Sequence, residues 1–177
     1  LCLCLTLLST AVLAEDDGLV KPGEAAELST DTTVAYLIVK DSAQVQSLHY
    51  TLASAVTEAM KLANKGDEVT IVLDGATKTI SAEGVPAICS TQPIVLDLAK
   101  HRVGGTIKVG SEDGQQTGLL KIIDESASGI YSGSGSIENV TVHTNSSLTL
   151  DGTVQTGIGT LSHDTDARIT LLSGNIS

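Results

Sequence analysis

The chain has 177 residues, which is enough for one domain with a sizeable core, alone or behind a leader. Hydrophobic residues make up 41% of the sequence but aromatic residues only 2%, and Phe and Trp are absent. We therefore expect an aliphatic core and no aromatic platform for stacking sugars or bases. With 21 acidic and 10 basic residues the net charge is -11. This charge argues against nucleic acid and anionic membranes as partners, because both attract cations.

An apolar run opens the chain at residues 1–14 and is followed at once by the acidic Glu15-Asp16-Asp17. Such a run, ending in small residues, predicts the apolar part and the cleavage site of a secretory signal peptide, with cleavage after Ala14. It is shorter than the ~20 apolar residues of a transmembrane helix, so we expect no membrane-spanning segment in the mature chain. The basic start of a signal peptide is missing, and residues 169–177 break off within a repeat. We therefore expect a partial signal peptide and a truncated C-terminus.

Cysteine usage excludes a disulfide-stapled scaffold. Cys2 and Cys4 belong to the expected leader, so the mature chain retains only Cys89 and has no intrachain pairing. Cys89 ends the apolar, strand-like run at residues 85–89. The local sequence offers no base to activate it, so we expect a buried, inert thiol.

Residues 15–49 are expected to form an N-terminal segment in which residues 34–39 are a strand. The only predicted helix follows over residues 50–66, with Thr51 as its N-cap and the polar residues 64–67 as its end. Its apolar residues recur at helical spacing: Leu52, Ala55, Val56, Ala59, Met60 and Ala63.

After Gly66, short strand-like runs alternate with turn residues, and the runs resemble one another. They lie at residues 69–74, 94–97, 120–124, 148–151 and 169–172. Counted from Asp74 to Asp97, Asp124, Asp151 and Ser173, the steps between them are 23, 27, 27 and 22 residues. A unit of this length with two or three strands is typical of one coil of a parallel β-helix, whose coils stack at about 4.8 Å. An antiparallel sandwich is the alternative, but it does not explain the recurring aliphatic–Asp ending. We therefore predict β-helix coils over residues 67–177.

Several stretches also resemble a known family. Residues 50–59 read YTLASAVTEA, residues 65–73 read KGDEVTIVL, residues 94–102 read IVLDLAKHR and residues 147–153 read SLTLDGT. They resemble secreted bacterial right-handed β-helix surface proteins, which are adhesin-like and share the pectate-lyase-like fold. The resemblance implies an all-β, right-handed parallel β-helix with an N-terminal α-helical cap, an exported location and no catalytic residue. The family's Asn-Gly turn is replaced here by Ala99-Lys100, so that corner is expected to differ.

One loop offers candidate metal ligands. Residues 163–168 read HDTDAR, and the spacing of Asp164 and Asp166 places both carboxylates on one face of an extended segment. We name these two as the candidates for a metal site, with calcium as the only cofactor considered. A solvated turn before the strand at Ile169 is the alternative. The N-T-D, G-H-G and R-I-K signatures of pectin-degrading β-helix enzymes are missing, and the only D-D is Asp16-Asp17 in the leader junction.

Other polar groups have structural interpretations. The recurring aspartates would stack as a column, for which turn capping is expected and calcium is the alternative: Asp74, Asp97, Asp124 and Asp151. The basic cluster of Lys100, His101 and Arg102 is expected to be a surface loop. Three N-x-S/T sites, at Asn139, Asn145 and Asn175, are interpreted as turns in a bacterial chain.

The function that these observations favour is structural or adhesive. We expect a secreted or cell-surface β-helix that binds a host or matrix glycan or protein, with no catalytic site within these residues. The first alternative is a carbohydrate-active lyase or hydrolase whose site lies beyond residue 177. The second is a passive spacer without a ligand.

Overall fold

The computed structural model of the chain describes residues 33–40, 45–126, 131–151 and 157–172. The expected signal peptide, the predicted cleavage site and Asn175 lie outside these ranges. Within them are one helix, α1 (Leu52–Ala63), and eleven strands. The strands are β1 (Ala35–Val39), β2 (Val45–His49), β3 (Val69–Leu73), β4 (Thr79–Ser81), β5 (Ile94–Asp97), β6 (Arg102–Val109), β7 (Leu119–Ile123), β8 (Ser136–Val142), β9 (Ser147–Asp151), β10 (Gly157–His163) and β11 (Arg168–Leu172).

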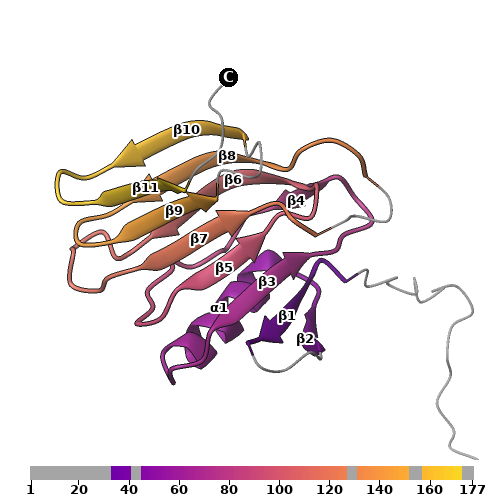
Figure 1. Ribbon diagram of the computed structural model, residues 1–177, viewed down its shortest axis with the longest axis horizontal. Coiled ribbons are helices and arrows are strands. Elements are labelled where there is room, and N and C mark those ends of the chain that lie inside the picture. Colours follow the sequence, from indigo (N-terminus) through magenta and orange to yellow (C-terminus); the bar gives the residue numbers. More distant parts are fainter. Residues whose placement is uncertain (1–32, 41–44, 127–130, 152–156, 173–177) are drawn as a thin grey trace, which may run out of the picture. The chain divides into compact units, whose positions relative to one another are not determined.

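The strands form two sheets whose neighbours come from successive repeats (Figure 1). Sheet A has the order β11-β9-β7-β5-β3-β1-β2, and sheet B has the order β10-β8-β6-β4. From β3 onward every pairing is parallel in both sheets. The arrangement is a β-solenoid of about four turns, which confirms the predicted parallel repeat and excludes the antiparallel sandwich.

The register corrects the predicted column of aspartates. Val69, Ile94, Leu120, Leu148 and Ile169 stand at one level of sheet A, so the coils between them are 25, 26, 28 and 21 residues long. Three residues further along, Asp97 pairs with Val72 and Ile123, while Asp151 pairs with Leu172. Asp74 and Asp124 lie in turns beyond the strands. The prediction was wrong because the number of residues between successive aspartates differs from the number of residues between paired positions of successive coils.

The core consists of aliphatic ladders between the two sheets. Val69, Ile94, Leu120 and Leu148 are at most 2% exposed, and Ile71, Leu96 and Ile122 form a second buried row beside them. Sheet B adds rows of the same kind, made of Ile80, Val103 and Ile137, of Ile107 and Val140, and of Val109 and Val142. Stacking side chains of equal shape at each level fills a narrow interior without aromatic rings.

Helix α1 forms as the apolar spacing predicted. Thr51 is its N-cap, and the Thr51 hydroxyl accepts a hydrogen bond from the backbone N–H of Ser54. The helix buries Leu52, Ala55, Val56, Ala59 and Ala63 and contacts β1, β2, β3 and β5.

Two features of the first strands differ from expectation. β1 confirms the strand expected at residues 34–39, and it pairs antiparallel with β3 and so covers the edge of that strand. β2 was not predicted; it pairs antiparallel with β1 and therefore runs parallel to β3. The strand expected around Ile88 is reduced to one bridge to Val109.

Candidate functional site

The first corner, where sheet A strands turn toward sheet B, contains a buried carboxylate. The side chain of Asp124 is fully buried and accepts hydrogen bonds from the backbone N–H groups of Lys100 (2.6 Å) and Gly135 (2.8 Å). The ammonium of Lys100 lies 3.3 Å from the same carboxylate and donates to the backbone oxygen of Asp124 at 2.6 Å. Asp124 therefore ties the turn of one coil to the next turn of the same corner.

Asp97 has a similar role one coil earlier. Its carboxylate is buried and accepts hydrogen bonds from the N–H groups of Ala99 and Glu125 and from the N–H and hydroxyl of Ser126. For Asp97 and Asp124, the expected turn capping is thus what the structure shows, although they do not stack as a column.

The corner at Ala99-Lys100, which was expected to differ from an Asn-Gly turn, keeps a backbone conformation of that kind. Both residues have positive φ, at 44° and 69°, and the N–H of His101 donates to the oxygen of Leu98. This is the conformation that Asn-Gly adopts most easily, and side chains with a Cβ are strained in it. The carboxylates of Asp97 and Asp124 hold this strained turn in place by accepting hydrogen bonds from the N–H groups of Ala99 and Lys100.

Arg102 is exposed as expected, whereas the surface-loop expectation is wrong for His101, which is only 2% exposed. Its Nδ1 lies 3.0 Å from the oxygen of Ala99, and its Nε2 lies 3.0 Å from the oxygen of Gly75 in the preceding coil. The ring of Tyr131 meets it edge-on with centroids 5.2 Å apart, and the Lys78 ammonium lies 5.6 Å from the tyrosine centroid. The imidazole therefore links two successive coils through its hydrogen bonds.

The second corner, where sheet B strands turn back toward sheet A, contains the residues that the sequence singled out. The turns His143–Ser146 and Asp164–Ala167 occupy equivalent positions, because Val142 pairs with His163 and Ser147 with Arg168. One Asp164 carboxylate oxygen accepts the N–H of Thr144 at 2.9 Å and lies 3.3 Å from Nδ1 of His143. The Thr144 N–H, aided by His143, holds the pKa of Asp164 below its usual value. Asp164 thus joins two coils, as a capping residue does.

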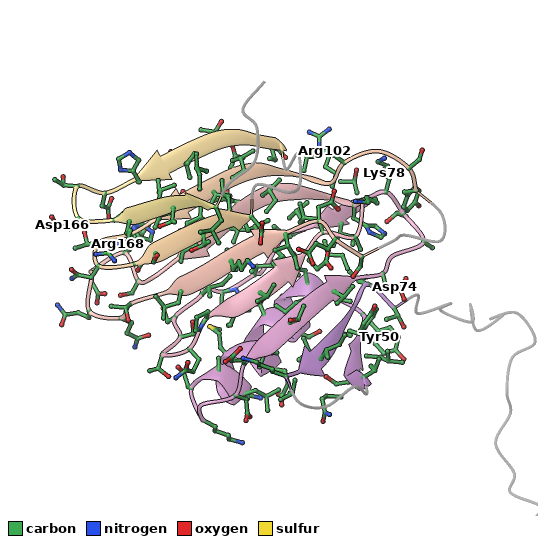
Figure 2. The ribbon with its side chains drawn as sticks, viewed as in Figure 1. Tyr50, Asp74, Lys78, Arg102, Asp166 and Arg168 are labelled. Carbon is green, nitrogen blue, oxygen red and sulfur yellow. The ribbon has the colours of Figure 1, made fainter. Side chains whose placement is uncertain are left out.

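A groove beside these turns brings Asp166 and Arg168 together. Its volume is about 290 Å³, and it is lined by Leu119, Asn145, Ser146, Ser147, Asp166 and Arg168. We call this set the Asp166 groove. Figure 2 shows Asp166 and Arg168 at one end of the strands, opposite Lys78 and Arg102.

The register explains how the Asp166 groove forms. Leu119, Ser147 and Arg168 begin β7, β9 and β11 at one level, while Asn145 and Asp166 are the matching turn positions of two coils. Within the ranges that the structure describes, no hydrogen bond or ion pair engages the side chains of Asn145, Asp166 or Arg168. A carboxylate, a carboxamide and a guanidinium are therefore free to bind a polar ligand together.

Among the described residues, no cluster of carboxylates supports the predicted metal site. Asp164 is occupied by Thr144 and His143, and in the part of the chain that the structure describes no three His, Cys, Asp or Glu side chains are placed to hold a metal ion. Calcium at Asp164 and Asp166 stays a prediction. His143 itself is buried, and among the described residues its Nε2 has no hydrogen-bond partner.

The sequence missed Asn145 as a lining residue of the groove. It reaches the groove through a turn in which its φ is 60°, a conformation that Asn tolerates. Asn145 lies 21 residues before Asp166, and the pairing of the strands shows that this step joins equivalent positions of two coils.

Cys89 is half-buried, not fully buried, and burial raises the pKa of its thiol, in line with the expected low reactivity.

Comparison with known proteins gives no match, whether to a protein family, to a curated protein or to a solved structure. In the described ranges, no helix is both long and apolar enough to cross a membrane.

Proposed function

We propose that the chain is a secreted or cell-surface protein with a structural and adhesive role, built as a right-handed parallel β-helix with α1 as its N-terminal cap. The cap is supported by the buried face of α1, which packs against the first strands and extends their apolar core. Right-handed coiling is supported by the resemblance of the repeats, and export by the apolar run before Glu15.

The observation that carries the adhesive role is the Asp166 groove. It presents a carboxylate, a carboxamide and a guanidinium on the rigid turns of a solenoid, and the described residues satisfy none of the three. Rigid placement lowers the entropy lost on binding, and each charged group gives strong, directional hydrogen bonds. A host or matrix glycan offers hydroxyls and carboxylates that match these groups without an aromatic platform.

An array of glycans and matrix proteins tests this proposal. We expect the purified chain to bind a subset of the array, and Arg168→Ala or Asp166→Ala to weaken that binding roughly tenfold or more, the effect of losing a charge-assisted hydrogen bond. Lys108→Ala is the matched control, because Lys108 is an exposed cation on β6, away from the groove lining.

The outcomes separate the alternatives. Binding that Lys108→Ala preserves and Arg168→Ala removes supports adhesion through the groove. Binding that all three variants preserve contradicts the role of the groove. Absence of binding to every ligand on the array supports the passive spacer instead.

A further inference from the structure

A serine and a histidine lie in hydrogen-bond contact at the other end of the molecule from the Asp166 groove. Ser47 and His49 are alternate residues of β2 and pair with the buried Leu37 and Ala35 of β1. The Oγ of Ser47 lies 2.8 Å from Nε2 of His49. Alternate residues of a strand lie on one face, and on this face His49 contacts Ser54 of α1.

The hydrogen bonds around His49 fix which ring nitrogen carries the proton. Ser54 donates its hydroxyl proton to the backbone oxygen of Thr51 at 2.9 Å, because a carbonyl oxygen only accepts. The contact of 3.1 Å between Ser54 Oγ and His49 Nδ1 therefore places the ring proton on Nδ1. Nε2 is left with a lone pair directed at the hydroxyl of Ser47, as a general base requires.

The surroundings favour a neutral imidazole. Burial lowers the pKa of His49, against a smaller opposite effect of Glu58. Ser54 belongs to the first turn of α1, whose first N–H groups have no partner inside the helix and whose dipole is positive at this end. This positive end lies on the Nδ1 side of His49, where it disfavours a second proton on the ring.

We propose that Ser47 is a nucleophile with His49 as its general base, giving the chain a slow acyl-transfer activity toward small carboxylic esters. The Ser47 oxygen bonds to the ester carbonyl carbon while its proton moves to Nε2 of His49. The tetrahedral intermediate expels the alcohol, which takes that proton. Water then attacks the acyl carbon and gives a proton to Nε2 of His49. The second tetrahedral intermediate breaks its bond to the Ser47 oxygen, which takes that proton back, and the carboxylic acid is released. The activity is slow because the group that orients His49 is a hydroxyl, which stabilises an imidazolium less than a carboxylate does.

A fluorophosphonate probe tests the proposal on the full chain, since the serine oxygen bonds to phosphorus as fluoride leaves. We expect peptide mass spectrometry to find the adduct on Ser47, and His49→Gln to slow its formation about 100-fold. Ser54→Ala should slow it less, and Ser81→Ala is the control, because Ser81 is exposed on β4 and hydrogen-bonds to the backbone of Glu83.

A pH profile of the wild-type reaction gives a measurement that needs no variant. The labelling rate should fall as acid protonates His49, with a midpoint below that of an ordinary histidine. Three results would overturn the proposal: no adduct on Ser47, labelling that survives in urea, or a rate that neither His49→Gln nor acid lowers.

Discussion

Removing the carboxylate of Asp124 should destabilise the first corner severely. Asp124→Ala deletes the acceptor for the N–H groups of Lys100 and Gly135 and leaves the ammonium of Lys100 without its partner. Breaking a buried ion pair costs about 3–5 kcal/mol, and we expect the lower end because the Lys100 side chain is 27% exposed and reaches water. The strained turn before His101 also loses the hydrogen bond that holds it.

Urea unfolding followed by circular dichroism measures the effect. A loss of about 3 kcal/mol at a slope of roughly 1–3 kcal/mol per molar lowers the unfolding midpoint by about 1–3 M. Glu125→Ala is the matched control: the side chain of this neighbouring residue is exposed, and its substitution should stay within about 0.5 kcal/mol of the wild type. Equal midpoints for Asp124→Ala and Glu125→Ala would refute the reasoning.

Three further predictions follow from backbone geometry and charge. Gly118→Ala should lower the free energy of unfolding by ~2 kcal/mol or more, because the new Cβ would lie 2.1 Å from a backbone oxygen. Gly157→Ala should be tolerated, because its Cβ would meet only a side-chain carbon at 3.5 Å. The urea unfolding midpoints of the two variants check both expectations. Ala99→Gly should stabilise the chain by ~0.5 kcal/mol through relief of its positive φ, while Ala59→Gly in α1 should destabilise it by about 1 kcal/mol in the same assay. Folding lowers the pKa of Asp164, so its contribution to the free energy of unfolding is present above its unfolded pKa of about 3.8 and is lost as the pH falls through the lowered value. Thermal melts from pH 6 to pH 2 should therefore show a smaller drop in melting temperature for Asp164→Asn than for the wild type.

The sequence predicted the repeated elements because local patterns determine them. The aliphatic runs at 69–74, 94–97 and 148–151 form strands of sheet A, and Thr51 caps the one helix. The sequence did not predict the register of the strands, because the coils differ in length and the aspartates do not occupy equivalent positions in successive coils. Register depends on pairing between strands far apart in the chain, which no short motif records.

The candidate site was predicted only in part, for a related reason. Asp164 and Asp166 were singled out from one loop, but only Asp166 lines the groove, together with Arg168 from the end of that loop. Asn145 comes from the preceding coil, and only the 21-residue register step places it opposite Asp166. Lys100 and His101 were expected on the surface because they are basic, but buried carboxylate and carbonyl acceptors overcome that preference.

The two corners of the solenoid use the same residue type for opposite purposes. At the first corner, Asp97 and Asp124 are buried and their oxygens accept several N–H groups each, so a ligand or cation would have to displace existing hydrogen bonds. At the second corner, Asp164 is only partly used by its neighbours, and Asp166 bonds to none of the described residues. Stability should therefore respond to substitutions at the first corner, and ligand binding to substitutions at the second. A variant such as Asp166→Ala that abolished binding and left the unfolding midpoint unchanged would separate the two roles within one fold.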